Sequence, residues 1–202
     1  MKKGLARGPR RVVQGAVRGA AQGAIGRKLA RTVQPTGRER SFDVDDIIVS
    51  KTDVKGHITY ANRVFLRVAG FEEREVIGAP HSIIRHPEMP RCVFKLLWDT
   101  LAAGKEVFAY VNNLAKSGDN YWVFAHVTPS LDGSGNTVGY HSNRRVPERR
   151  VVEETIMPLY RSLLEEEKRH ADRKAGLDAS YQMLLGLLKE KGVGYDELVF
   201  SL

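Results

Sequence analysis

The sequence is poor in the features that build disulfide-linked and membrane-spanning proteins. It has one cysteine, Cys92, among 202 residues, and no apolar run as long as the ~18 residues that a spanning helix needs. A single cysteine excludes an intramolecular disulfide and a cysteine-based zinc cage, so a reducing compartment is the simplest interpretation. The N-terminus also lacks the uninterrupted apolar region of roughly 7–15 residues that marks a secretory signal. We therefore expect a cytoplasmic protein.

Acidic residues are scarce in only one part of the chain. Residues 1–40 hold eleven Lys and Arg against one acid, Glu39, while the remaining 162 residues hold 21 bases and 23 acids. The overall net charge of +8 therefore belongs to the N-terminal end. The rest of the chain is nearly neutral and offers no basic face for phosphates, so the composition predicts no nucleic-acid partner.

Residues 1–40 are predicted to form a basic tail that is rich in Gly and Ala. Apolar residues between Val12 and Ile25 recur at helical spacing, and glycines recur every four residues along the same segment. Two interpretations remain open for residues 1–35. The segment folds as a basic amphipathic helix on a partner or on an anionic membrane surface, peripheral to the inner face of the membrane, or it is a disordered basic arm.

Residues 41–147 have the pattern of an α+β domain. Apolar runs at 46–52 and 56–62 predict two strands joined by a tight turn. Later in the domain, connections rich in Gly, Asp, Ser and Asn separate three more strand-like runs, as in a meander of hairpins. These runs occupy residues 105–115, 120–131 and 136–146.

Helical patterns lie between the two groups of strands. Residues 62–71 and 71–78 predict short helices, and residues 90–104 predict a longer helix that ends at a glycine. One stripe of the longer helix is apolar and consists of Val93, Phe94, Leu97, Trp98 and Leu101. We expect three aromatic residues to belong to the core: Trp98, Tyr121 and Trp122.

Residues 148–202 are predicted to be an amphipathic helical extension. Apolar residues recur on one helical face between Val152 and Leu163, and Pro158 predicts a kink or two abutting helices. Such a face must be buried against something. Two interpretations remain open: the extension contacts a partner or a second copy of the chain as a homodimer, or it folds back onto the preceding domain.

Several motifs in residues 41–147 resemble the PAS domain of Aer-type aerotaxis sensors. The segment ITYANRVF resembles the PAS signature in which a strand runs into an Asn-containing helix start. The remaining landmarks are R-H-P-x-M-P, W-x-T-L-x-x-G, N-x-x-K-x-G-D-x-Y-W-V and G-Y-x-S-x-R. The resemblance implies a PAS fold, in which a five-stranded antiparallel sheet carries short helices on one face, here followed by the helical extension.

The same resemblance implies a function. Aer-type PAS domains bind FAD non-covalently and report redox or oxygen-linked state to a chemotaxis signalling system. The organisation of the chain is similar to stand-alone sensors that act with a separate chemoreceptor-like protein, so we expect energy taxis or aerotaxis signalling. The absence of a Ser–His–Asp order, of paired metal ligands and of a phosphate-binding glycine loop favours a sensor over an enzyme.

The resemblance, carried over motif by motif, also implies the residues that contact the cofactor. They are Asn62, Arg85, His86, Glu88 and Asn113. Arg85 and His86 supply donors for a pyrophosphate, and an Asn amide offers a donor and an acceptor to the edge of the flavin ring. An apolar slot for the ring is expected from Val64, Phe65, Val93, Leu97 and Tyr110.

The sequence departs from the family pattern at two positions. Glu88 stands where the family more often has Asp, which keeps the charge. Val107 stands where family members commonly have Trp, so a flavin-side aromatic is missing, and Phe108 is the candidate to replace it in part.

Simpler roles remain open for the same residues. Arg85 and Glu88 form a plain salt bridge, His86 is a structural histidine, Asn113 is an ordinary strand residue, and His81 is a structural cap. Two other PAS functions also remain open: a haem sensor with His81 or His86 as axial ligand, and a cofactor-free dimerisation or interaction module. Cys92 follows Pro90 rather than lying in an Asn-Cys-Arg motif, which argues against a photosensor that forms a cysteinyl-flavin adduct.

Overall fold

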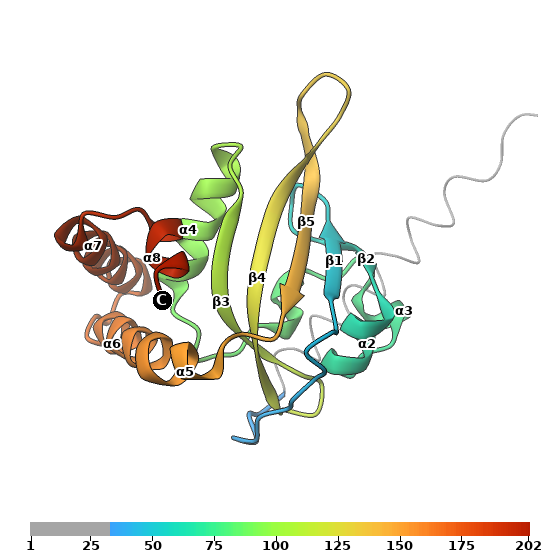
Figure 1. Ribbon diagram of the computed structural model, residues 1–202, viewed down its shortest axis with the longest axis horizontal. Helices are drawn as coiled ribbons and strands as arrows, with labels where there is room; N and C mark the ends of the chain where they lie inside the picture. Colours follow the sequence, from blue (N-terminus) through green and yellow to red (C-terminus); the bar gives the residue numbers. More distant parts are fainter. Residues whose placement is uncertain (1–32) are drawn as a thin grey trace, which may run out of the picture.

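The computed structural model describes residues 33–202, which contain a five-stranded antiparallel sheet with the strand order β2-β1-β5-β4-β3 (Figure 1). The strands are β1 (Ile48–Thr52), β2 (Ile58–Ala61), β3 (Val107–Leu114), β4 (Asn120–Leu131) and β5 (Thr137–Arg145). Each strand lies within a run predicted from the sequence, and the predicted α+β class with an antiparallel sheet is confirmed. The interpretations of residues 1–35 fall almost entirely outside the described residues.

Short helices connect the first two strands to the meander of β3, β4 and β5. They are α2 (Arg63–Ala69), α3 (Glu73–Val76), the 3₁₀ helix η1 (His81–Ile84) and the longer α4 (Arg91–Ala102). Helix α2 begins at Asn62, whose side-chain Oδ1 accepts from the Phe65 N–H at 2.8 Å, and ends at Gly70, which has a φ of 73°. A left-handed φ favours glycine, so the sequence sets both ends of this helix.

The last residues of the predicted tail are bonded to the domain. Thr36 N–H donates to the Gly118 carbonyl at 2.8 Å, and Arg40 N–H donates to the Asn120 carbonyl at 2.7 Å. Gly118 has a φ of 90°, and a Cβ there would clash with the Gln34 carbonyl oxygen. The predicted boundary at residue 40 therefore falls inside a segment that pairs with the β3–β4 hairpin.

The C-terminal extension is helical, as predicted. Its elements are α5 (Arg149–Val151), the π-helical segment η2 (Val152–Ile156), α6 (Met157–Lys168), α7 (Arg173–Lys191) and α8 (Tyr195–Phe200). Pro158 has no N–H to donate, and the π-helical turn just before it accommodates the proline within a continuous helical course. Within residues 33–202, every helix is too short or too polar to cross a bilayer.

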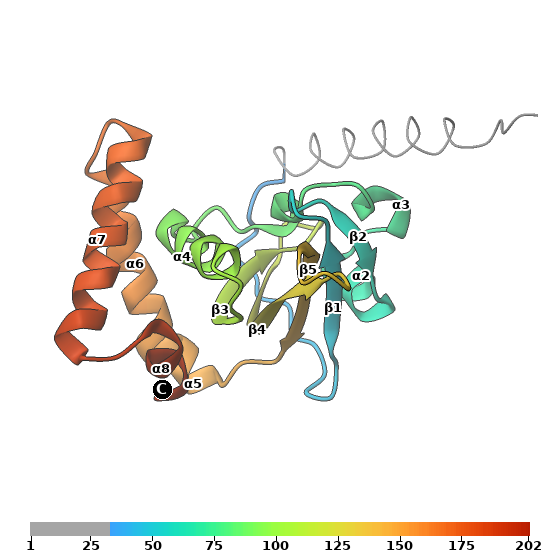
Figure 2. The same cartoon turned by 90° about the horizontal axis from the view of Figure 1, so that it is seen from above.

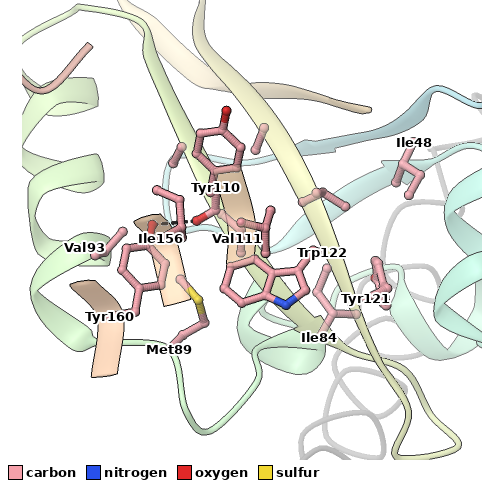
Figure 3. Close-up of a cluster of buried hydrophobic side chains, with 14 of the residues drawn as sticks. Ile48, Ile84, Met89, Val93, Tyr110, Val111, Tyr121, Trp122, Ile156 and Tyr160 are labelled. Atoms are coloured by element: carbon pink, nitrogen blue, oxygen red, sulfur yellow. Dashed lines mark hydrogen bonds between the residues drawn. The ribbon is translucent and has the colours of Figure 1, made fainter. Parts of the chain in front are cut away.

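The extension folds back onto the domain. Helices α6 and α7 lie side by side, α7 packs against α4, and α8 packs against strand β3 (Figures 1 and 2). The Tyr160 hydroxyl of α6 donates to the Tyr110 carbonyl of β3 at 2.7 Å, next to the buried side chains of Met89 and Trp122 (Figure 3). Leu163 and Leu184 are also buried in this core. The apolar face of the extension is thus covered by the chain's own domain.

Candidate functional site: a polar-lined cavity

A cavity of about 320 Å³ lies between the sheet and the helices η1 and α4. This volume is at the lower end of the range of small-molecule sites, roughly 300–1,000 Å³. Its apolar walls are Ile84, Phe94, Leu97, Trp98, Leu101, Val111, Ala125, Val127 and Tyr140. Its polar walls include Ser50, Thr52, Lys55, His81, Ser82, Arg85, Asn113, Ser142 and Arg144.

Strand register explains why polar side chains from distant parts of the chain meet here. Alternate residues of a strand point to the same face of the sheet, so Ser142 and Arg144 of β5 point to the side of the helices. Ser142 pairs with Ser50 of β1 on one side and with Val127 of β4 on the other. The cavity therefore receives side chains from both neighbours of β5, the central strand.

Several buried polar atoms at the cavity have no hydrogen-bond partner. Within residues 33–202, Thr52 Oγ1, Asn113 Nδ2, Ser142 Oγ and Arg144 Nη1 are buried and unpaired, and all four residues line the cavity. A buried polar group without a partner costs about 1–3 kcal/mol. A bound molecule with complementary donors and acceptors would remove this cost, so the cavity has the polarity of a ligand site.

Arg144 is the most heavily buried charge at the site. It is 3% exposed, and its Nη2 donates to Ser50 Oγ at 2.8 Å and to His81 Nε2 at 2.7 Å. Burial lowers the pKa of the guanidinium to about 10, so Arg144 remains charged at neutral pH. The Arg144 side chain also lies over the Phe65 ring, with Cζ 5.8 Å from the ring centroid.

His81 is held neutral next to Arg144. Burial, followed by the nearby Arg144 charge, lowers the pKa of His81 from 6.5 to about 3. Because Arg144 donates to Nε2, the proton of the neutral ring lies on Nδ1. Ser50 Oγ is 3.1 Å from the same Nε2. His81 opens helix η1, and its ring is engaged with two polar side chains from β1 and β5.

Arg85 lies between the cavity and a second, basic pocket. Its Nη2 donates to the Met89 carbonyl at 3.2 Å, and its guanidinium lies 4.1 Å from the centroid of the Phe94 ring. The second pocket has a volume of about 470 Å³ and is shared with the C-terminal extension. Its charged residues are Arg85, Arg91, Glu167, Lys168 and Arg173. Burial lowers the pKa of Arg85, and the positive charges of Arg91 and Arg173 lower it further.

The structure brings two of the five predicted site residues to the cavity. Arg85 and Asn113 both line it, and their backbones form an isolated antiparallel bridge. Asn62 lies away from the cavity, with its amide used locally, because it caps α2 and its Nδ2 donates to the Ile47 carbonyl at 2.8 Å. These contacts occupy the groups that a cofactor would need.

His86 and Glu88 also lie outside the lining of the cavity. His86 is buried, its Nδ1 accepts from the Glu88 N–H at 3.2 Å, and burial lowers its pKa. Glu88 is exposed and lines a different pocket with Trp122 and Arg161. Among the ion pairs of residues 33–202, none joins Arg85 to Glu88, so the salt-bridge alternative is wrong for this conformation.

The expected apolar slot has a different composition. Of the five residues expected to form it, Leu97 alone lines the cavity; Val64, Phe65, Val93 and Tyr110 do not. Trp98 is 40% exposed rather than a core residue, and it contacts Tyr140 edge to face with ring centroids 5.3 Å apart. The apolar stripe predicted which face of α4 points inward. Part of that face lines the cavity rather than packing against other side chains.

Phe108 does not replace the missing tryptophan. Its ring stacks on His126 at a centroid distance of 4.2 Å and contacts Phe200 of α8. Val107, the neighbouring residue, is buried against Leu97 and Leu101. Since successive strand residues point to opposite faces, Phe108 lies on the side of the sheet away from the cavity. Trp98 and Phe94 supply the aromatic walls instead.

The sequence motifs contained a signal for the residues that were missed. Ser142 and Arg144 are two positions apart within the G-Y-x-S-x-R landmark, on a predicted strand. Alternation would have placed them on one face together with Tyr140. Nothing in the local sequence indicates that Ser50 and His81 meet them, because β1–β5 pairing brings Ser50 there and the position of η1 brings His81.

Comparisons with known proteins agree with this architecture. Residues 58–144 match the family described as PAS fold. The aerotaxis receptor of Escherichia coli (strain K12) is 38% identical over 120 residues, which is 59% of this chain and 23% of that protein. The nitrogen fixation regulatory protein of Klebsiella pneumoniae is 27% identical over 99 residues, 49% of this chain and 20% of that protein. The chain thus aligns with less than a quarter of the length of either relative.

A solved structure from work on a flavin analogue in a light-oxygen-voltage domain also overlaps with this chain. It has a TM-score of 0.48 and 23% sequence identity, and the overlap covers 57% of this chain and 87% of that one.

Proposed function

We propose that residues 58–144, which match the family described as PAS fold, form a PAS domain whose cavity binds a flavin, FAD, as part of a redox or oxygen-linked sensor. The observation that carries the proposal is the set of unpaired buried polar atoms around a cavity that also has a large apolar wall. A cavity formed only by loose packing would be apolar, since leaving polar groups unpaired is costly.

The residues present fit a flavin ring. One edge of an isoalloxazine carries carbonyl and ring-nitrogen groups that require donors and an acceptor, while the opposite edge is apolar. Asn113 Nδ2 and Arg144 Nη1 are free donors, and the Ser142 hydroxyl is free to donate or accept. Phe94, Trp98 and the aliphatic wall provide the apolar slot. When bound, the flavin supplies reversible electron uptake, which these side chains cannot provide.

The phosphates of FAD have a suitable partner in the basic pocket. Arg85 borders both the cavity and this pocket, so a ligand that spans the two spaces passes its guanidinium. Arg91, Lys168 and Arg173 add positive charge there. Glu167 is already paired with Arg91, with Oε2 2.7 Å from Nε, and leaves the pocket basic. This arrangement favours FAD over a flavin without phosphates.

We infer that the output passes to a chemoreceptor-like signalling protein. The resemblance to Aer-type sensors and the similarity to an aerotaxis receptor support this partner. Asn113 lies on β3, Ser50 on β1, Arg144 on β5 and His81 on η1. Ligand-dependent changes at these side chains would be transmitted through those elements, in a sensing role without catalysis. The same proposal includes a homodimer. It also includes contact of residues 1–35 with an anionic membrane at its cytoplasmic face.

An absorption spectrum of the purified protein, taken in air and then with dithionite, tests the proposal. Flavin bands in the blue and near-ultraviolet that bleach on reduction are the expected result. A single intense Soret band would instead favour the haem alternative. A protein that stays colourless after refolding with added FAD would leave a cofactor-free interaction module and refute the flavin proposal.

A further inference from the structure

Arg144 is a buried charge without a counter-ion in the described part of the chain. None of the ion pairs within residues 33–202 includes it, and the hydrogen bonds of its side chain in that range go to the neutral groups of Ser50 and His81. One terminal nitrogen, Nη1, has no partner. A buried charge is costly to retain unless something compensates it.

The surroundings of Arg144 do not need it for their own hydrogen bonding. Ser50 Oγ and His81 Nε2 lie 3.1 Å apart and can pair with each other if the guanidinium is removed. Arg144 lines the cavity together with Ser142, whose hydroxyl is also unpaired. The local structure thus keeps a permanent cation and free donors facing a space for a ligand.

We propose that Arg144 selects the charge state of the ligand in the cavity. Its positive charge favours the state in which the ligand edge facing β5 carries more negative charge. The inference rests on the proposed flavin site and deepens it. A flavin that takes up two electrons and one proton gains one negative charge. In a cavity with a fixed cation and no counter-ion, that form is stabilised relative to the oxidised one. Arg144 would therefore set how readily the bound flavin is reduced.

The first arm of the test uses FAD, with dithionite as the reductant that is oxidised to sulfite. Arg144→Met is expected to lower the affinity for reduced FAD about 10- to 100-fold relative to the affinity for oxidised FAD. For a two-electron couple this change is a fall in midpoint potential of roughly 30–60 mV. Arg144→Lys, which keeps the charge, should have a midpoint potential close to that of the wild type. Arg145→Gln, an exposed neighbour on the same strand, should leave it unchanged.

The second arm uses the protein without FAD. Removing an uncompensated charge should leave the thermal unfolding midpoint of Arg144→Met equal to or above that of the wild type. FAD should then raise the midpoint less in Arg144→Met than in the wild type. This arm distinguishes the two proposals. If the wild type binds no FAD, the flavin proposal fails, while a stabilised Arg144→Met protein still assigns the charge to a ligand.

Two results would overturn the inference. One is an Arg144→Met protein with the wild-type potential. The other is a ligand-free Arg144→Met protein with a much lower midpoint, which would make Arg144 a structural residue of the β1–β5 pair. If Arg144→Met does not fold, Arg144→Lys decides the second case: a lowered midpoint despite the retained charge shows that the guanidinium contacts are structural.

Discussion

Replacing Glu167 by alanine is expected to detach the C-terminal helices from the α+β domain. Glu167 lies on α6 and is 8% exposed. Its carboxylate accepts from the Arg91 N–H at 2.6 Å, the Cys92 N–H at 3.2 Å and Arg91 Nε at 2.7 Å. Pro90, at the N-cap of α4, makes no side-chain cap, so Glu167 caps this helix from another element.

The structure sets the expected magnitude. Removing one partner of a buried ion pair costs about 3–5 kcal/mol, because the other charge and the capped N–H groups remain behind. The Arg91 side chain is 24% exposed, so water reaches it and the lower end, ~3 kcal/mol, applies. In a chain of this length ~1 kcal/mol shifts the melting temperature by roughly 2–4 °C, which gives a fall of about 6–12 °C. Glu167→Gln keeps an acceptor oxygen and should cost less than half as much.

Urea unfolding followed by tryptophan fluorescence and circular dichroism measures the loss. Limited trypsin digestion adds a local readout, since α6 and α7 become cleavable when they separate from α4. Glu165→Ala is the matched control, because Glu165 is exposed on the same helix. A Glu167→Ala protein with the stability and protease resistance of Glu165→Ala would refute the assignment of Glu167 as the link between α6 and α4.

Three further outcomes are expected. Asn113→Ala should weaken FAD binding about tenfold in a fluorescence titration, since its unpaired Nδ2 is a donor for the ligand, without lowering the stability of the ligand-free protein. His81 has a folded-state pKa of about 3, below its ordinary 6.5, so between these two pH values its ring is protonated in the unfolded chain but not in the folded one. The contribution of His81 to the free energy of unfolding should be constant above pH 6.5 and should decrease by at most ~1.4 kcal/mol per pH unit as the pH falls below 6.5. His81→Gln should remove this contribution when urea unfolding is compared at pH 7 and pH 5. Arg173→Gln should weaken binding of FAD a few-fold, by about 0.5–1 kcal/mol, and leave riboflavin binding unchanged in calorimetry.

Each of these outcomes has a contrary result. Full FAD affinity in Asn113→Ala would remove this residue from the site. Identical pH dependence in the wild type and His81→Gln would show that His81 titrates normally. Equal losses of FAD and riboflavin affinity in Arg173→Gln would show that the basic pocket does not hold the phosphates, and Arg150→Gln, an exposed charge outside that pocket, is the control.

Local sequence patterns predict the order of the elements and the ends of several of them. Alternating apolar residues and turn residues located the strands, and Asn62 and Gly70 fixed both ends of α2. These features depend on neighbours within about one turn of chain, which a sequence displays directly. The resemblance to Aer-type PAS domains, and not a local pattern, implied Arg85 and Asn113 as cofactor contacts, and both line the cavity.

Which side chains meet depends on the packing of segments that are far apart in the chain. Ser50, His81 and Arg144 form one group because β1 pairs with β5 and η1 lies over that pair. Periodicity shows which face of an element is covered but not what covers it. For this reason helical spacing predicts a core position for Trp98, which lines the cavity instead, and does not indicate what covers α6 and α7. The cap that Glu167 gives to α4 depends on packing between segments about 75 residues apart, and no local pattern encodes it.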